Sequence, residues 1–308
     1  MIKKIILLAL GVCSLSLGMS AQTLPILTLG GDMRSSGMAG VAPARGSHAN
    51  IYSSVVNPFY GDATRLAADY LAGIHTTKAS GLATYHQATA TYALSSGRAL
   101  SLGWRYLGGM QTDYLDAHGN KIGVVHPRDW SLDLGYSHLL DNNWLGWGRI
   151  GYLQSYNSAV ADVVTASAGV AYRSERIDAL PSYMVGLSIE NFGTKVKYAK
   201  SEISSNQPTL VRLSGSISLL ESGSLTLGGG ATYHLATAGE KKFGYYVGGE
   251  WQPIQMFALR TGYSSSPNGN VWSVGAGFSY NSISLDLAYN LHEHKLFNML
   301  KLGLAYRL

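Results

Sequence analysis

Cysteine is nearly absent from this chain, and charged residues are scarce. The only cysteine, Cys13, lies near the N-terminus, so the chain beyond it can form neither disulfides nor thiolate metal sites. Charged residues make up 13% of the sequence, about half the share usual for a soluble domain. Without Lys3 and Lys4, the 23 basic residues fall to 21 against 18 acidic ones, a net charge of +3. This balance gives no support for binding to nucleic acid.

Long apolar runs are also missing after the first seventeen residues. No later stretch approaches the ~20 consecutive apolar residues of a membrane-spanning helix. The chain is nevertheless 46% hydrophobic, with a mean hydropathy of +0.05 and with 37 glycines and 20 tyrosines. Dispersed hydrophobicity with many aromatic residues is typical of a membrane β-barrel.

The first 21 residues have the layout of a secretory signal peptide. Lys3 and Lys4 form a charged start, and a mostly apolar run follows from residue 5 to residue 17. Ser20 and Ala21 precede the expected cleavage site. The sequence therefore predicts a signal peptide over residues 1–21.

Alternation with period two repeats from residue 66 to the end of the chain. Successive side chains of a strand point to opposite faces, so each such segment has one apolar and one polar wall. The pattern predicts fourteen strands, an even number as in bacterial single-chain barrels. They span residues 66–75, 82–94, 99–108, 129–138, 144–156, 162–173, 182–190, 209–219, 224–235, 243–251, 256–264, 271–280, 282–290 and 300–308. The predicted fold is all-β, a 14-stranded antiparallel transmembrane β-barrel over residues 66–308.

The last predicted strand ends the chain without a tail. Lys301, Gly303, Tyr306 and Leu308 follow the spacing of the C-terminal signal that the bacterial barrel-assembly machinery reads. Connections after even-numbered strands are mostly short, whereas 109–128, 191–208, 236–242, 265–270 and 291–299 are generally longer and polar. Outer-membrane barrels have this asymmetry between periplasmic turns and extracellular loops. We therefore expect the protein in the cell outer membrane, in contact with its lipid.

The segment before the first strand is rich in Gly, Ser and Ala and does not alternate. A fourteen-strand barrel encloses more volume than its inward side chains fill. We therefore predict that residues 22–65 fold into the lumen as an N-terminal plug.

Charged residues on the predicted inward face could line a polar pore or form ion pairs with each other and with the plug. We favour the second interpretation, and expect Asp133 to pair with Arg105 or Arg149, since these lie on neighbouring strands. The predicted lumen and plug-anchoring residues are Arg105, Asp133, Arg149, Arg212, Glu250, Arg260 and Asp286, with Glu190, Lys301 and Arg307 also inward.

Several short motifs stand out in the sequence: a plug motif of Asp32, Arg34, Gly37, Asn57 and Pro58, and segments at residues 130–136, 186–193 and 259–263. Together these motifs resemble the PorV/PorQ family of outer-membrane proteins of the type IX secretion system, which are related in fold to the FadL transporters. The resemblance implies a plugged fourteen-strand barrel that handles secreted cargo. It also implies protein partners, namely translocon or attachment-complex subunits and the C-terminal domains of exported cargo.

No enzymatic pattern stands out, and we predict no catalytic residue, cofactor or metal. The phosphate-binding Gly-Lys-Ser/Thr and the Gly-x-Ser-x-Gly motifs are absent, and the pair His292 and His294 has no third ligand nearby.

Three hypotheses about function remain. The first is a subunit acting in protein secretion (type IX-like) through its extracellular loops. The alternative is a FadL-type transporter of hydrophobic small molecules, which needs an apolar pocket in the lumen. The predicted inward positions are mainly Gly, Ser, Thr and charged, which argues against it, although Leu24, Ile26, Leu27 and Leu29 could supply apolar groups. A plain structural or diffusion barrel is the third.

Overall fold

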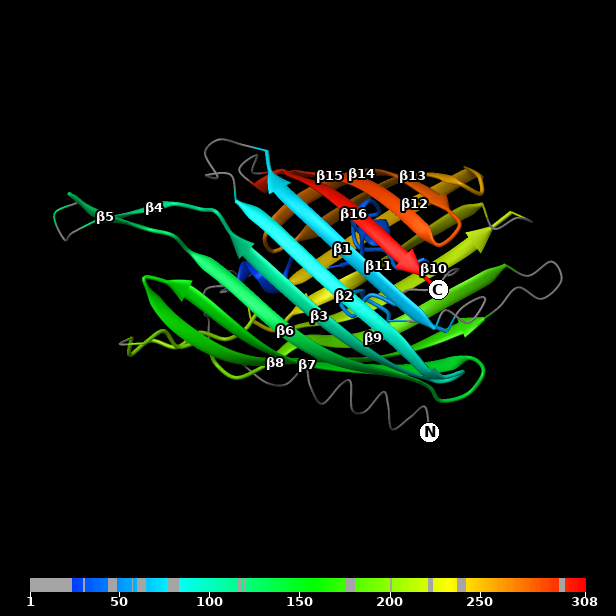
Figure 1. Ribbon diagram of the computed structural model, residues 1–308, viewed down its shortest axis with the longest axis horizontal. Helices are drawn as coiled ribbons and strands as arrows, with labels where there is room; N and C mark the ends of the chain where they lie inside the picture. Colours follow the sequence, from blue (N-terminus) through cyan, green and yellow to red (C-terminus); the bar gives the residue numbers. More distant parts are fainter. Residues whose placement is uncertain are drawn as a thin grey trace.

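The computed structural model describes residues 24–29, 31–43, 49–56, 58–59, 65–76, 83–115, 118, 120–174, 181–199, 201–220, 224–236, 242–293 and 297–308. Within these residues, fourteen antiparallel strands close into one barrel (Figure 1). The predicted signal peptide and Asn57 lie outside the described residues.

The strands agree with the predicted segments, with ends that differ by a few residues, so the fourteen-strand barrel is confirmed. The barrel strands are β1 (Leu66–His75), β2 (Thr84–Ser95), β3 (Arg98–Gly108), β6 (Arg128–Leu139), β7 (Trp144–Asn157), β8 (Ala159–Ser174), β9 (Ser182–Gly193), β10 (Leu210–Leu219), β11 (Leu225–His234), β12 (Phe243–Ile254), β13 (Phe257–Ser266), β14 (Gly269–Tyr280), β15 (Ile283–His292) and β16 (Met299–Arg307).

The barrel closes between its first and last strands. Leu66 and Leu308 exchange two backbone hydrogen bonds, of 3.1 and 2.9 Å, at the start of β1 and just beyond the end of β16. Closure leaves no open strand edge, which a strand in lipid requires because no water is there to satisfy its backbone.

The outer face of the barrel is apolar and the inner face is polar, as the alternation predicts. On β16, Leu302 and Leu304 are about half exposed, whereas the alternating residues Lys301 and Gly303 are buried toward the lumen. No helix among the described residues is long and apolar enough to cross a membrane. A closed barrel with an apolar exterior matches the bilayer core, so the chain is an integral outer-membrane barrel.

The two ends of the barrel differ in the length of their connections. The short-turn end carries turns such as 96–97, 255–256 and 281–282 together with the C-terminus. The long-loop end carries residues 109–127, 194–209 and 293–298. Two predicted loops at this end differ: 265–270 shrinks to a two-residue turn between β13 and β14, and 109–128 contains a hairpin of β4 (Thr112–Leu115) and β5 (Lys121–Val125) that projects beyond the rim (Figure 1).

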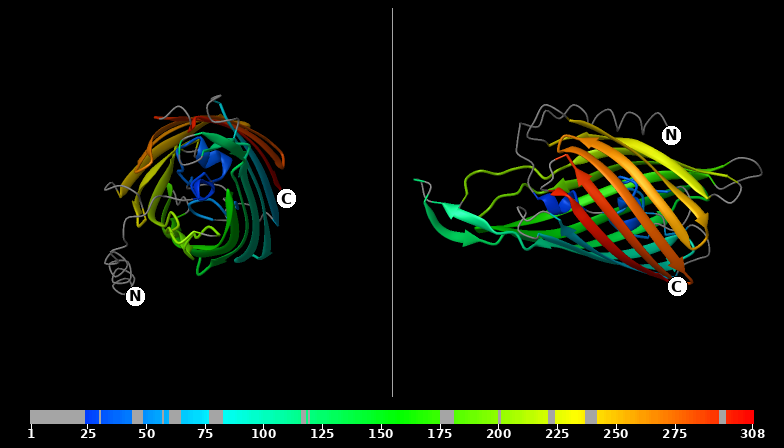
Figure 2. Two further views of the ribbon diagram at one scale, coloured as in Figure 1. Left: turned by 90° about the vertical axis from the view of Figure 1, so that its left-hand side faces the viewer. Right: turned by 90° about the horizontal axis from the view of Figure 1, so that it is seen from above.

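Residues 24–43 and 49–56, as far as they are described, lie inside the ring of strands (Figure 2). This lumenal segment contains the 3-10 helix η1 (Pro25–Leu27) and the short helix α2 (Met33–Ser36). Asp32 caps α2 by accepting a hydrogen bond of 2.8 Å from the backbone N–H of Ser35. The proposed limits of the plug, residues 22–65, stay a prediction, since several of these residues are not described.

Inward glycines of the wall make room for the lumenal segment. A Cβ on Gly262 would lie 2.5 Å from the carbonyl carbon of Met38, and one on Gly135 would lie 2.8 Å from Cδ1 of Ile51. Such distances are too short for any side chain, so the chain passes against bare strand backbone there. The same relation joins inward glycines of other strands to this segment, at Gly103, Gly186, Gly228, Gly248, Gly275 and Gly303.

Candidate functional site in the lumen

Helix α2 is joined to the wall by a chain of four charged side chains. Arg34 donates two hydrogen bonds to Glu250 of β12, of 2.9 and 2.5 Å. Arg260 of β13 donates to the same carboxylate at 2.6 Å and also pairs with Asp286 of β15. The charges alternate in sign along this row of four side chains, so each buried charge faces one of opposite sign.

A second cluster surrounds Tyr52. Its hydroxyl donates a hydrogen bond of 2.7 Å to Asp133, which also forms an ion pair with Arg105 at 3.3 Å. The Arg105 guanidinium lies 4.2 Å from the centre of the Tyr52 ring. Burial raises the pKa of the Tyr52 phenol well above its usual range, so Tyr52 stays a donor at neutral pH.

Arg149 connects the lumenal segment to the end of β9. It donates to the carbonyl of Ile51 at 3.2 Å and to the side-chain oxygen of Asn191 at 3.0 Å. Asn191 has a left-handed backbone, with φ of 56°, beside a β-bulge that shifts the register between β8 and β9. Sequence reasoning overlooked Asn191, although an Asn-Phe-Gly sequence at a strand end is a signal for such a bulge.

The other predicted site residues are spread around the barrel. Arg212 pairs with Glu190 at 2.9 Å within the wall, and Lys301 lies 3.4 Å from the hydroxyl of Ser36. Gly37 ends α2 against Arg260, and Gly303 lies under Met33. Pro58 is buried, and the Arg307 guanidinium lies 3.9 Å from the Asp69 carboxylate. Tyr306 on β16 and Leu308 just after it are exposed on the outside of the barrel. The anchoring and assembly roles of these residues stay predictions.

An apolar cluster lies toward the long-loop end of the lumen, among inward positions that the sequence predicted to be mainly Gly, Ser, Thr and charged. Leu71, Tyr85, Leu107, Leu153 and Val163 point inward there and are each at most 3% exposed. We call this the apolar chamber. Its full set of buried residues is Leu24, Ile26, Leu27, Met33, Leu71, Tyr85, Leu107, Leu153, Ala161, Val163, Val196, Ala288 and Met299.

The polarity of the strand ends explains why the sequence alone did not indicate this cluster. Val163 is followed by Val164, Leu107 is preceded by Tyr106, and Met299 is followed by Leu300. Both faces are apolar in such pairs, so alternation does not report which residue points inward.

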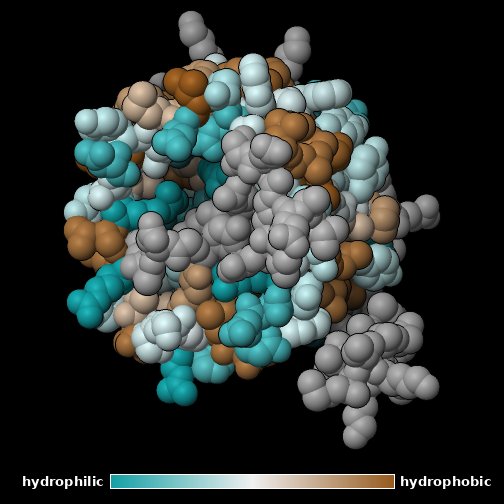
Figure 3. All heavy atoms as spheres, turned by 90° about the vertical axis from the view of Figure 1, so that its right-hand side faces the viewer, coloured by the Kyte–Doolittle hydropathy of each residue, from teal (hydrophilic) through white to brown (hydrophobic). Residues whose placement is uncertain are grey.

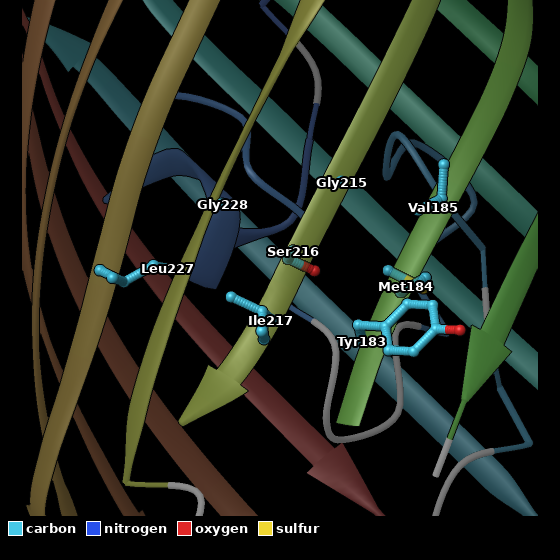
Figure 4. Close-up of a pocket in the computed structure, with 8 residues that line it drawn as sticks. All are labelled: Tyr183, Met184, Val185, Gly215, Ser216, Ile217, Leu227 and Gly228. Atoms are coloured by element: carbon cyan, nitrogen blue, oxygen red, sulfur yellow. The ribbon is translucent and has the colours of Figure 1, made fainter. Parts of the chain in front are cut away.

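Two hollows of the structure lie outside this cluster, one of them small and the other on the outer face. A polar cavity of about 30 Å³, roughly one water in size, lies between the lumenal segment and β1 and β16, and Asp32, Asp69 and Asp286 line it. A shallow groove of about 310 Å³ lies on the outside of β9–β11, where Gly215 presents no side chain between Val185, Ile217 and Leu227 (Figure 4). At the short-turn end, hydrophilic residues line the visible hollow of the mouth (Figure 3).

No group of three potential metal ligands comes together among the described residues. His292 packs edge-on against Phe297, with ring centres 6.2 Å apart, and His294 is outside the described part of the chain.

No protein-family model and no curated protein matches the sequence, but solved structures share its fold. The toluene transporter TodX of Pseudomonas putida aligns with a TM-score of 0.57 at 10% identity, over 94% of this chain and 98% of that one. A FadL homologue of Pseudomonas aeruginosa gives 0.56 at 11% identity, over 94% and 97%. The monoaromatic hydrocarbon channel CymD gives 0.57 at 11% identity, over 91% and 97%. The chain therefore has the fold of the FadL-like outer-membrane barrels.

Proposed function

We propose that this protein admits small hydrophobic molecules across the outer membrane, and that the apolar chamber is where they bind. The chamber carries the proposal, because a cluster of buried aliphatic side chains within a charged lumen is what binding of an apolar molecule requires. The shared fold supports it, since the similar structures include a toluene transporter and a monoaromatic hydrocarbon channel.

The chain's own side chains occupy the chamber in this structure. Leu24, Ile26 and Leu27 of the lumenal segment are at most 5% exposed and pack within it. A bound hydrocarbon that displaced these side chains would make similar apolar contacts with the rest of the chamber. The apolar area buried in the chamber would therefore change little. The proposed ligand is therefore a compact apolar molecule of about the size of a few aliphatic side chains.

Binding of 4-fluorotoluene tests the proposal. The barrel is refolded into nanodiscs, and the bound fraction is measured by fluorine NMR against empty nanodiscs. We expect binding by the natural chain and its loss in Leu153→Asn and Val163→Asn, because an amide in the chamber would lack partners. Thr226→Asn, which is inward at the short-turn end, is the matched control. A natural chain that gives the same spectrum as empty nanodiscs would reject the proposal.

A role in type IX-like protein secretion is a second candidate, supported by the β4–β5 hairpin. Ile122 and Val124 on this projecting hairpin are 59% and 45% exposed, beyond the rim rather than on the lipid-facing wall. Exposed apolar side chains in such a place suit a protein partner. Replacing residues 111–126 by a short Gly-Ser turn should reduce the secretion of cargo with conserved C-terminal domains, while leaving fluorotoluene binding unchanged. Unaltered secretion would reject this second candidate.

A further inference from the structure

We infer that residues 194–199 and 201–209, which we call the lid, form a movable cover over the apolar chamber and that its opening controls access to the chamber. This inference rests on the proposed function and adds the regulation of the same site.

The lid lies along an edge that the barrel leaves uncovered. Strand β8 extends farther toward the long-loop end than its neighbour β9, so the backbone of residues 159–164 is not paired with β9. The first part of the lid pairs with it instead: Thr194 donates to the carbonyl of Val164 at 3.0 Å, and Ala199 to that of Val160 at 2.8 Å. The lid thus continues the sheet with two backbone bonds rather than with a full ladder.

Side chains of the lid point from this edge into the chamber. Val196 is 2% exposed and belongs to the chamber cluster, and Tyr198 packs against that cluster from the lid. The Tyr198 hydroxyl lies 2.9 Å from that of Ser155 on β7. Viewed from the long-loop end, the lid crosses inside the ring of strands (Figure 2). The lid therefore covers part of the apolar chamber at the long-loop end.

The base of the lid combines a fixed point with a pivot. Asn191 is held by Arg149 and donates weakly to the carbonyl of Leu27, at 3.4 Å, within the chamber. Two residues later, Gly193 has φ of 154°, a conformation that other residues rarely adopt. A swing that begins beyond Gly193 can thus leave the pairing of β8 with β9 and the contacts of Asn191 in place.

Of the parts that enclose the chamber, the lid is the most weakly held. The wall is a closed ladder of strands, and Arg34 with Glu250 ties the lumenal segment to it by charged bonds. The described contacts of the lid with the strands include neutral hydrogen bonds and apolar packing, among them a hydrogen bond of 2.7 Å from the Gln207 side chain to the carbonyl of Val164 on β8. Neutral hydrogen bonds contribute less than charged ones, so the lid opens before the other parts yield.

A reversible tether tests the inference. Cys13 is the only cysteine and lies in the predicted signal peptide, so the double variant Val160→Cys/Ala199→Cys forms one defined pair. The backbone hydrogen bond from Ala199 to Val160 places the two residues side by side, where a disulfide can join neighbouring segments. Ser279→Cys/Ser284→Cys, at the short-turn end, is the matched control, because these hydroxyls lie 2.9 Å apart across a fixed hairpin.

The readout is the association rate of 4-fluorotoluene in nanodiscs. We expect oxidation of the lid pair to slow association at least about tenfold, with recovery after reduction, and oxidation of the control pair to change nothing. Equal rates in the oxidised and reduced lid variants, when the natural chain does bind, would overturn the lid and leave the proposed function standing. Absence of binding in every variant would instead overturn the proposed function.

A second measurement follows the lid without any ligand. Spin labels at Ile203→Cys, on the exposed part of the lid, and at Asn268→Cys, in the β13–β14 turn at the same end of the barrel, report their separation by pulsed electron resonance. We expect a broad or two-peaked distribution that shifts when fluorotoluene is added. A single narrow peak, unchanged by the ligand, would contradict a movable lid.

Discussion

Arg34 and Glu250 face each other through two parallel hydrogen bonds, although 216 positions separate them in the chain. One side chain belongs to a helix of four residues and the other to the barrel wall. Glu250 is 3% exposed, and one of its carboxylate oxygens also accepts a hydrogen bond from a second arginine, Arg260. Loss of the carboxylate would therefore leave two arginines close together without a shared anion.

Glu250→Gln should release helix α2 from the wall. We expect the free energy of unfolding to fall by about 3 kcal/mol, as when one partner of a buried ion pair is removed. Denaturant titration in lipid vesicles measures this loss, and trypsin cleavage after Arg34 reports the release directly. Asp113→Asn is the control, because its pair with Lys121 is more than half exposed and surface pairs are worth ~0–1 kcal/mol. Resistance to trypsin equal to that of the natural chain would contradict the anchoring role.

Tyr52→Phe should lower stability at neutral pH by about 1–2 kcal/mol, since it removes a buried hydrogen bond to the Asp133 carboxylate. The difference from the natural chain should shrink above pH ~10. Burial raises the pKa of Tyr52 in the folded state, so the unfolded chain ionises first and the stability of the natural protein falls by about 1.4 kcal/mol per pH unit there. Phenylalanine lacks this ionisation. Parallel stability curves for the two proteins from pH 8 to 11 would show that Tyr52 is not buried in this way.

Gly262→Val should displace the lumenal segment, because its Cβ would meet the backbone of Met38 and Ala39. We expect a loss of about 2 kcal/mol, as for overpacking in a core, together with faster cleavage after Arg34. Gly146→Val makes the same change on the outer face of β7, where the nearest atom to a new Cβ is 3.9 Å away. Equal protease sensitivity of the two variants would indicate that the lumenal segment does not rest on Gly262.

The barrel could be predicted from the sequence because lipid and lumen impose opposite polarity on neighbouring residues. Along β16, Leu302 and Leu304 must face lipid while Lys301 and Gly303 face inward, and this contrast repeats in many of the strands. Inward charges such as Asp133 were identifiable for the same reason, since their direction follows from the register.

The contents of the lumen could not be predicted in the same way. The contacts of Tyr52 and Arg34 join positions far apart in the chain, and no local pattern encodes them. The apolar chamber was hidden because strand ends such as Val163-Val164 are apolar on both faces. The lid follows a β-bulge at Asn191, where the strand leaves its regular pairing.

Substitution of Tyr306 can distinguish a role in the predicted assembly signal from a role in packing the barrel. Its ring faces outward on the closing strand, as does that of Tyr280 on β14, and both lie near the short-turn end. Tyr306→Ser and Tyr280→Ser should therefore lower the free energy of unfolding by similar amounts when the purified chains refold into vesicles, because each loses one aromatic ring at the membrane interface.

In cells, Tyr306→Ser should reduce the amount of folded barrel severalfold more than Tyr280→Ser, since only Tyr306 lies in the segment that the assembly machinery would read. Heat-dependent mobility in gels separates folded from unfolded barrel in membrane extracts. Equal amounts of folded protein from the two variants would assign Tyr306 a packing role alone.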